Sequence, residues 1–115
     1  MAIEKKPIAH EAEIQLKKTN PSVTGGVVLN SANGCTNGAR MGISYYSDEK
    51  YQTCGVHDDQ ELFYVLDGTG FVLLGEKEYP ITVGSVFVAT PGTPHSIRRN
   101  EDSPPIKILW FHGAP

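Results

Sequence analysis

Histidine and glutamate stand at metal-ligand spacing in the segment CGVHDDQELFYVLDG, residues 54–68. His57 precedes Glu61 by four residues, and Glu61 begins an apolar run whose side chains should alternate between the two faces of a strand. This alternation places Glu61 on the same face as Phe63 and Val65, directed toward an apolar interior where an unpaired charge is costly. A divalent cation shared with His57 would compensate both side chains, so the segment predicts part of a metal site.

A second histidine follows a stiff turn. The run GSVFVAT, residues 84–90, leads into Pro91-Gly92-Thr93-Pro94, and His95 begins the next run. Proline on both sides of Gly92 restricts the backbone, so His95 leaves the loop in a fixed direction. Metal sites lose affinity when their ligands are loosely held, and His95 is therefore a good candidate for a second ligand.

Turn signals divide the chain into short strands that would position these residues. Glycine and proline recur at short intervals, and the intervening runs are rich in β-branched and aromatic residues. These runs are GVVLN (26–30), ARMGISYY (39–46), ELFYVL (61–66), GFVLLG (70–75), SVFVAT (85–90), HSIRR (95–99) and IKILWFH (106–112). They predict an all-β sandwich or small barrel. Residues 8–18 fit a helix and a strand equally well.

Composition favours one soluble globular domain and no polyanionic partner. The chain has 115 residues, 39% of them hydrophobic, and a net charge of −3. The basic residues are scattered, so we expect neither nucleic-acid nor membrane binding. No apolar run has the roughly 18 residues of a membrane span, and the first residues lack the apolar core of a signal peptide, which together suggest a cytoplasmic protein. Cys35 and Cys54 are expected to be free thiols.

The segment around His57 resembles the first motif of the cupin superfamily, G-x5-H-x-H-x(3,4)-E-x6-G. Glu61 and Gly68 match the second half of this motif, and His57 falls on its second histidine. Gly55 occupies the position of the first histidine. One of the four ligands that the motifs usually supply is therefore missing.

The segment around His95 resembles the second cupin motif, G-x5-P-x-G-x2-H-x3-N. Gly84, Gly92 and His95 match it, whereas Thr90 replaces the proline and Arg99 replaces the asparagine. The short stretch between the two motifs is like that of small single-domain bacterial cupins. Counted with the flanking strands, the resemblance extends from about residue 39 onward.

This resemblance implies an all-β fold, the cupin double-stranded β-helix or jelly-roll barrel. The chain would form one domain over 1–115, with an N-terminal arm over about 1–38 and the conserved barrel over about 39–113. The inherited metal ligands are His57, Glu61 and His95, a 2-His-1-carboxylate set that can hold Fe, Mn, Ni or Zn and leave coordination positions open. Cupins are usually homodimers. We expect a homodimer here because both faces of 61–66 are apolar and need cover, which the N-terminal segment of a neighbouring chain could supply.

Several further residues are candidates for the site or its pocket. The groups that could fill the vacant ligand position are Cys54, Gln60, Tyr46 and Asp59, although Cys54 is out of phase with Gly55 in a regular strand. His112 alternates with Trp110 and Ile108 near the end of the chain, which fits either a barrel-lining residue or a satisfied core histidine. Asp58 and Asp59 would add negative potential near the barrel mouth. The possible pocket residues are Cys54, Gln60, Tyr46 and His112.

Two hypotheses about function follow from the resemblance. In the first, the protein is a small metalloenzyme, a dioxygenase or an isomerase or lyase acting on a small molecule. In the second, it is a non-catalytic cupin that binds a sugar or an organic acid without metal, with the same polar groups acting as hydrogen-bond partners. A purely structural, partner-binding domain is disfavoured by the inward placement of Glu61 beside His57. Whether a metal binds depends on which group, if any, replaces the motif histidine that is missing at Gly55.

Overall fold

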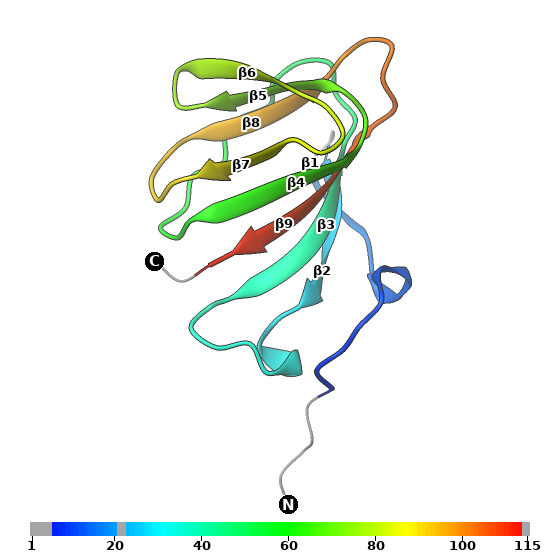
Figure 1. Cartoon of the computed structure of the whole chain (residues 1–115), viewed down its shortest axis with the longest axis vertical. Coiled ribbons are helices and arrows are strands. Elements are labelled where there is room, and N and C mark those ends of the chain that lie inside the picture. The colour runs from blue at the N-terminus through cyan, green and yellow to red at the C-terminus, as the bar shows by residue number, and fades with distance from the viewer. Residues whose placement is uncertain (1–5, 21–22, 114–115) are drawn as a thin grey trace, which may run out of the picture.

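The protein folds as two antiparallel β-sheets in the computed structural model, which describes residues 6–20 and 23–113 (Figure 1). The larger sheet has the order β1-β2-β3-β9-β4-β7 and the smaller one the order β6-β5-β8. The strands are β1 (Lys17–Asn20), β2 (Val23–Leu29), β3 (Arg40–Tyr46), β4 (Glu61–Asp67), β5 (Gly70–Leu74), β6 (Lys77–Ile81), β7 (Val86–Ala89), β8 (His95–Arg99) and β9 (Ile106–His112). Only two short 3-10 helices, Glu11–Glu13 and Ser31–Asn33, occur among the described residues.

The all-β prediction is confirmed, and each of the seven predicted runs overlaps a strand. Two strands were not anticipated. The strand β6 has the sequence KEYPI, whose charges and Pro80 weaken the strand pattern, and it lies at an edge of the smaller sheet, where proline is tolerated. Residues 8–18, which the sequence left open, contain the 3-10 helix Glu11–Glu13 and the start of β1.

The two faces of β4 have different surroundings. Glu61, Phe63 and Val65 are buried on the inner face, as the alternation predicted. Leu62 and Tyr64 on the outer face are 42% and 44% exposed. A single chain therefore covers only the inner face of this apolar strand.

Between the sheets lies an aliphatic and aromatic core, in which Phe63 stacks on Phe87 with ring centroids 4.6 Å apart. The buried cluster consists of Phe63, Val65, Val72, Ile81, Ala89, Ile97, Ile106 and Ile108. Burial of such side chains is the main stabilising contribution to a small β-domain. The core ends where Glu61 and His112, both buried, replace the aliphatic side chains.

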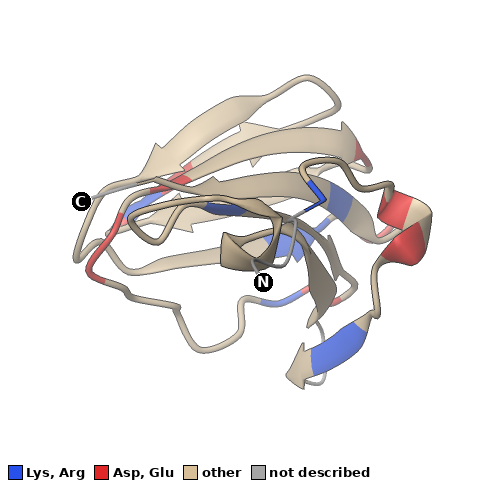
Figure 2. Ribbon diagram, turned by 90° about the horizontal axis from the view of Figure 1, so that it is seen from below, with Lys and Arg blue, Asp and Glu red and all other residues tan. Residues whose placement is uncertain are grey.

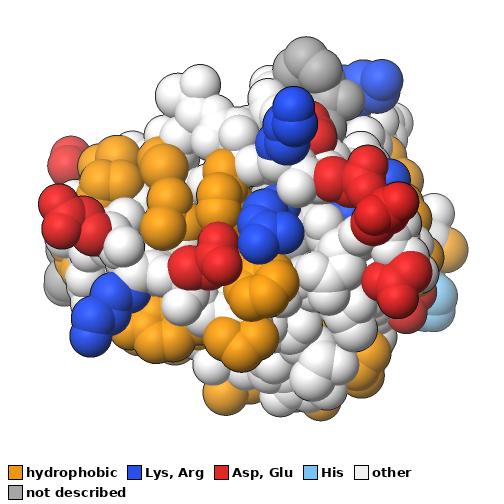
Figure 3. Space-filling model, turned by 90° about the horizontal axis from the view of Figure 1, so that it is seen from above, with side chains coloured by type: hydrophobic (Ala, Val, Ile, Leu, Met, Phe, Trp, Pro, Cys, Tyr) orange, Lys and Arg blue, Asp and Glu red, His pale blue; other side chains and the backbone are white. Residues whose placement is uncertain are grey.

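Charged residues are distributed over many elements. Figure 2 shows acidic and basic segments scattered along the chain, and Figure 3 shows acidic and basic side chains interspersed with hydrophobic ones on the face viewed from above. Over the described residues, none of the helices has the length and apolar character needed to cross a membrane.

Candidate metal centre

Strand register aligns three ionisable side chains at one end of the barrel. Glu61 of β4 is paired with His112 of β9, and His112 is paired with Arg40 of β3. Residues directly opposite one another in an antiparallel sheet project from the same face. Glu61 and His112 are only 6% and 7% exposed, so this row points into the barrel.

The loop before β4 is fixed to β8 by backbone hydrogen bonds. Gly55 and His95 form an isolated bridge in which each N–H donates to the other's carbonyl, at 2.9 and 3.0 Å. The N–H of Gly92 also donates to the His57 carbonyl at 2.9 Å. Gly92 has a φ of +78°, which glycine adopts without strain. The turn that directs His95 and the loop that carries His57 are thus held together.

The three predicted ligands lie together around the Glu61 carboxylate. Nε2 of His57 is 3.1 Å from Oε1 of Glu61, and Nε2 of His95 is 3.4 Å from the same oxygen. Their ligand atoms all lie within 4.8 Å of one another, close enough to bind one ion. His112, which the sequence left open, approaches the second oxygen, with Nε2 3.4 Å from Oε2.

Asp59 binds the opposite edges of two of these rings. Its Oδ1 is 3.2 Å from Nδ1 of His57, and its Oδ2 is 3.0 Å from Nδ1 of His112. The Arg40 guanidinium lies 3.5 Å from Oδ2. Burial alone would raise the pKa of Asp59, but the neighbouring His112, Arg40 and His57 together lower it, so the carboxylate stays ionised. The sequence offered Asp59 as a source of negative potential and as one of several groups that could fill the vacant ligand position, not as an orienting partner of two histidines.

Each of the three imidazoles has an oxygen acceptor at Nδ1 and Glu61 at Nε2. For His95 the acceptor is the Thr93 carbonyl, 3.2 Å away. A neutral imidazole carries one N–H, so when Nδ1–H donates to its acceptor, the lone pair on Nε2 faces the carboxylate. Lone pairs and a carboxylate that converge in this way are favourably bridged by a cation between them. The donor set therefore fits a divalent transition metal.

At His95, a proton can take the place of the metal. Burial lowers the pKa of His95, but hydrogen bonds to the Glu61 carboxylate and the Thr93 carbonyl outweigh burial, and the net pKa is raised. Metal and proton therefore compete for the same nitrogen. This competition is usual for histidine ligands, which must be deprotonated to bind metal.

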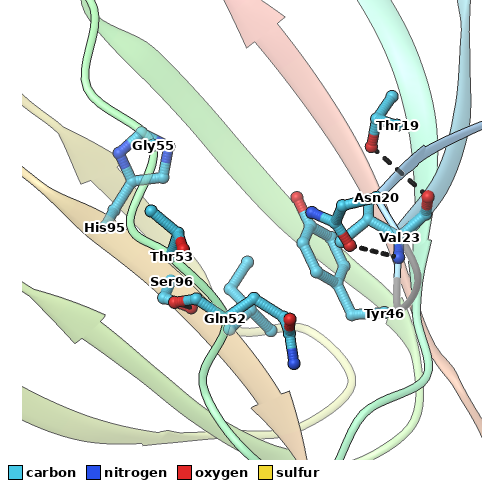
Figure 4. Close-up of a pocket in the computed structure, with 10 residues that line it drawn as sticks. Thr19, Asn20, Val23, Tyr46, Gln52, Thr53, Gly55, His95 and Ser96 are labelled. Carbon is cyan, nitrogen blue, oxygen red and sulfur yellow. Dashed lines mark hydrogen bonds between the residues drawn. The ribbon is translucent and has the colours of Figure 1, made fainter.

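A cavity of about 190 Å³ opens beside the cluster (Figure 4). It is lined by Thr19, Asn20, Val23, Tyr46, Gln52, Thr53, Gly55, His95, Ser96 and Ile97. In Figure 4, His95, Thr53 and Ser96 lie on one side, and Tyr46 lies with Asn20 on the other. A Cβ at Gly55 would lie 3.4 Å from Nε2 of His95, so the missing side chain leaves space directly beside a ligand.

The candidate pocket residues are divided between the cavity and its surroundings. Tyr46 lines the cavity, and burial together with the Glu61 carboxylate raises the pKa of its hydroxyl. Gln60 lies at the end of the barrel, where its carbonyl accepts a hydrogen bond from Gly113 at 3.2 Å. Cys54 is half-buried and, unlike Gly55, is not one of the described residues that line the cavity.

Family comparison agrees with the fold and the motifs. Residues 50–112 match the family described as "Cupin domain", and the chain belongs to this family. An uncharacterized protein of Methanocaldococcus jannaschii is 30% identical over 59 residues. That match covers 51% of this chain and 46% of the relative, so the chain aligns with less than half of the curated protein.

Solved structures share the jelly roll at low sequence identity. A predicted oxalate decarboxylase from Thermotoga maritima superposes with a TM-score of 0.78 at 19% identity, covering 94% of this chain and 99% of that one. The Fe(II) form of HppE superposes with a TM-score of 0.73 at 14% identity, covering 92% of this chain and 59% of that one. These likenesses confirm the predicted cupin jelly-roll fold.

Proposed function

We propose that this cupin is a small metalloenzyme that binds a divalent transition metal through His57, Glu61 and His95. The observation that carries the proposal is the convergence of two Nε2 atoms on one buried carboxylate oxygen, at 3.1 and 3.4 Å. Side chains held in this way by backbone bridges and by acceptors at Nδ1 need little rearrangement to bind an ion. Two histidines and one carboxylate also leave coordination positions open for a substrate.

The donor set suits Fe, Mn, Ni or Zn, and the Fe(II) form of HppE supports iron as the first metal to test. When bound, such a metal would supply Lewis acidity and, if redox-active, oxygen chemistry. The chain's own residues would orient it and restrict access by water. Glu61 lies at the boundary of the apolar core, and Phe63, two residues further along β4, packs its ring 5.8 Å from that of His95.

The cavity beside Gly55 and His95 is the proposed substrate site. Its described lining residues include hydroxyl and amide side chains, among them Tyr46, Gln52 and Ser96, and none of those described is Lys, Arg, Asp or Glu. Neutral hydrogen-bonding groups with apolar neighbours suit a small neutral or hydroxyl-bearing molecule, which would approach the metal from the side that Gly55 leaves open. Dioxygenase, isomerase and lyase chemistry are all compatible with such a site.

The same cavity supports a second candidate, a non-catalytic cupin that binds a sugar or an organic acid without metal. The favouring observation is that the cluster is already internally paired. Among the described residues, no buried side-chain nitrogen or oxygen lacks a hydrogen-bond partner. Metal content separates the two candidates.

We also propose a homodimer formed through the outer face of the larger sheet. An apolar groove on this face includes the side chains of Met41, Leu62, Tyr64, Val86, Val88, Leu109 and Phe111 in its lining. Val86 is 69% exposed, and apolar surface of this extent is often covered by a partner. Sedimentation should give twice the chain mass at micromolar concentration, and Val86→Lys should shift the protein toward monomer. A monomeric wild type would contradict this proposal.

Elemental analysis of protein purified without chelators tests the metal centre. We expect close to one transition metal per chain in the wild type and loss of metal in His57→Ala, Glu61→Ala and His95→Ala. The matched control is His10→Ala, because His10 is an exposed histidine remote from the cluster. A folded wild type that neither contains nor takes up metal would overturn the metalloenzyme and favour the second candidate, to be pursued by calorimetric titration with sugars and organic acids.

A further inference from the structure

We propose that His112, on the last strand, is a third imidazole ligand of the metal centre and takes the role that Gly55 leaves vacant. The inference rests on the proposed function and changes its ligand set from three side chains to four. The family motifs contain no histidine at this position, since both motifs end before β9. What points to His112 is its placement by strand pairing.

The position of His112 follows from the β4-β9 register. His112 is paired with Glu61 itself, so the two side chains leave neighbouring strands toward the same interior. Its Nε2 lies 3.4 Å from Oε2 of Glu61, the same separation that His95 shows to Oε1. Both oxygens of Glu61 thus face imidazole nitrogens, two at Oε1 and one at Oε2.

The orientation of His112 matches that of an established type of ligand. Metal-binding histidines usually donate their second ring N–H to a carboxylate or carbonyl, which fixes the tautomer. Asp59 accepts at Oδ1 from His57 and at Oδ2 from His112, at 3.2 and 3.0 Å. One carboxylate therefore directs two Nε2 lone pairs toward Glu61. His57, Glu61, His112 and Asp59 form a closed ring of contacts.

The His112 ring is also held by packing. It lies 4.7 Å from the His57 ring and meets the Trp110 ring edge-on at 5.3 Å. Trp110 is in turn fixed by a hydrogen bond from Nε1 to the Ser44 hydroxyl, 2.9 Å long. A buried imidazole held on two sides loses little conformational freedom when it binds an ion.

The Asp59 side of the cluster is the competing location for an ion. His57, Asp59 and His112 also lie close enough to hold one. Arg40, however, lies 3.5 Å from Asp59 and already places a positive charge there. None of the ion pairs found among the described residues joins Glu61 to lysine or arginine. Electrostatics therefore favour the cation at Glu61, with Asp59 acting as a positioning residue.

Titration with Co(II), followed by its visible absorption bands, tests the ligand set because band position and intensity report coordination. We expect His112→Phe, which keeps a ring in the packed position, to weaken Co(II) binding at least tenfold and to change the spectrum. Asp59→Asn should weaken binding about 10- to 100-fold, as loss of an orienting partner does, with a smaller spectral change. The exposed His10→Ala variant should behave as the wild type.

A rescue variant gives the sharpest test. A side chain at residue 55 would begin 3.4 Å from the His95 ring nitrogen, an ordinary contact distance, so Gly55→His can be accommodated. Combined with His112→Phe, it should restore Co(II) affinity to within a few-fold of the wild type. Gly55→Ala in the same background supplies no nitrogen and should not rescue.

The outcomes separate this inference from the function on which it rests. Unchanged affinity and spectrum in His112→Phe, together with loss of binding in His57→Ala, would overturn the His112 ligand and leave the three-residue centre intact. If Glu61→Gln retained Co(II) and Asp59→Asn lost it, the ion would lie at Asp59 instead of Glu61, and the proposal would be overturned. A folded wild type that binds no Co(II) would overturn both.

Discussion

The two ends of the β4-β9 ladder are built from the same pair of strands and are stabilised in opposite ways. Toward one end, Val65 is paired with Ile108, the last aliphatic pair before Asp67 and Lys107, and both are completely buried. At the other, Glu61 is paired with His112, and both are nearly as buried. Burial itself stabilises the aliphatic pair, whereas a buried carboxylate must be compensated by every charge and hydrogen bond around it.

Along this one pair of strands, the aliphatic end stabilises the fold and the polar end carries the candidate metal ligands. The aliphatic end fixes the position of both strands, because close-packed side chains resist displacement. Because the strands are rigid, the Glu61 carboxylate and the surrounding imidazole rings stay at fixed distances from one another. Binding groups placed on strands are positioned more accurately than groups placed on loops, and here Glu61 and His112 lie on strands while His57 lies on a loop.

The largest effect on stability is expected at the aliphatic end. Ile108→Ala should lower the free energy of unfolding by about 2–5 kcal/mol, since it removes fully buried methyl groups and leaves a cavity. Glu61→Ala, measured in the presence of a chelator, should lower it less, by about 1–3 kcal/mol, because the cost of burying the charge disappears while the histidines lose their hydrogen-bond partner. Urea denaturation of both variants and the wild type measures the two effects.

The effects of the two substitutions on metal binding should rank in the opposite order to their effects on stability. Ile108→Ala protein that remains folded should still take up metal, whereas Glu61→Ala should take up none. If Glu61→Ala destabilised the chelated protein as strongly as Ile108→Ala, the polar end would be a structural element in its own right, and the contrast between the two ends would fail.

Strand alternation was enough to predict the inner face of β4. The alternation of ELFYVL placed Glu61 with Phe63 and Val65, and all three are buried. The stiff Pro91-Gly92 turn likewise indicated a fixed direction for His95, whereas its place beside Glu61 was implied by the cupin resemblance and is seen in the structure. Both predictions depend on local geometry, which a sequence encodes directly.

The role of His112 could not be predicted in this way. It lies 51 residues after Glu61 in the sequence, and only the β4-β9 register brings the two together. The alternation of His112 with Ile108 indicated that the His112 side chain could point inward. It did not indicate which residue of the neighbouring strand lies beside it. For Asp59 a local signal existed, because His57 and Asp59 are two residues apart in one loop. A carboxylate so close to a candidate ligand is a candidate for orienting it.

The smallest predicted effect concerns the turn that couples the two ligand loops. Gly92→Ala should cost about 1 kcal/mol of stability, because a side chain at φ +78° is strained even though a Cβ meets no atom within 4 Å. It should also weaken Co(II) binding several-fold, since Gly92 N–H holds the His57 carbonyl and the same turn directs His95. Thermal denaturation and Co(II) titration measure the two effects separately.

Gly84→Ala is the matched control. Gly84 also has a positive φ, +91°, and a Cβ added there would meet no atom within 4 Å, but its N–H donates to the Val65 carbonyl, toward the aliphatic end. It should lose similar stability while keeping the Co(II) affinity of the wild type. Equal loss of affinity in both variants would mean that general destabilisation, rather than the Gly92 turn, controls the site. The two ends of the barrel would then be coupled through the whole fold, and the ligand geometry would depend on stability everywhere along β4.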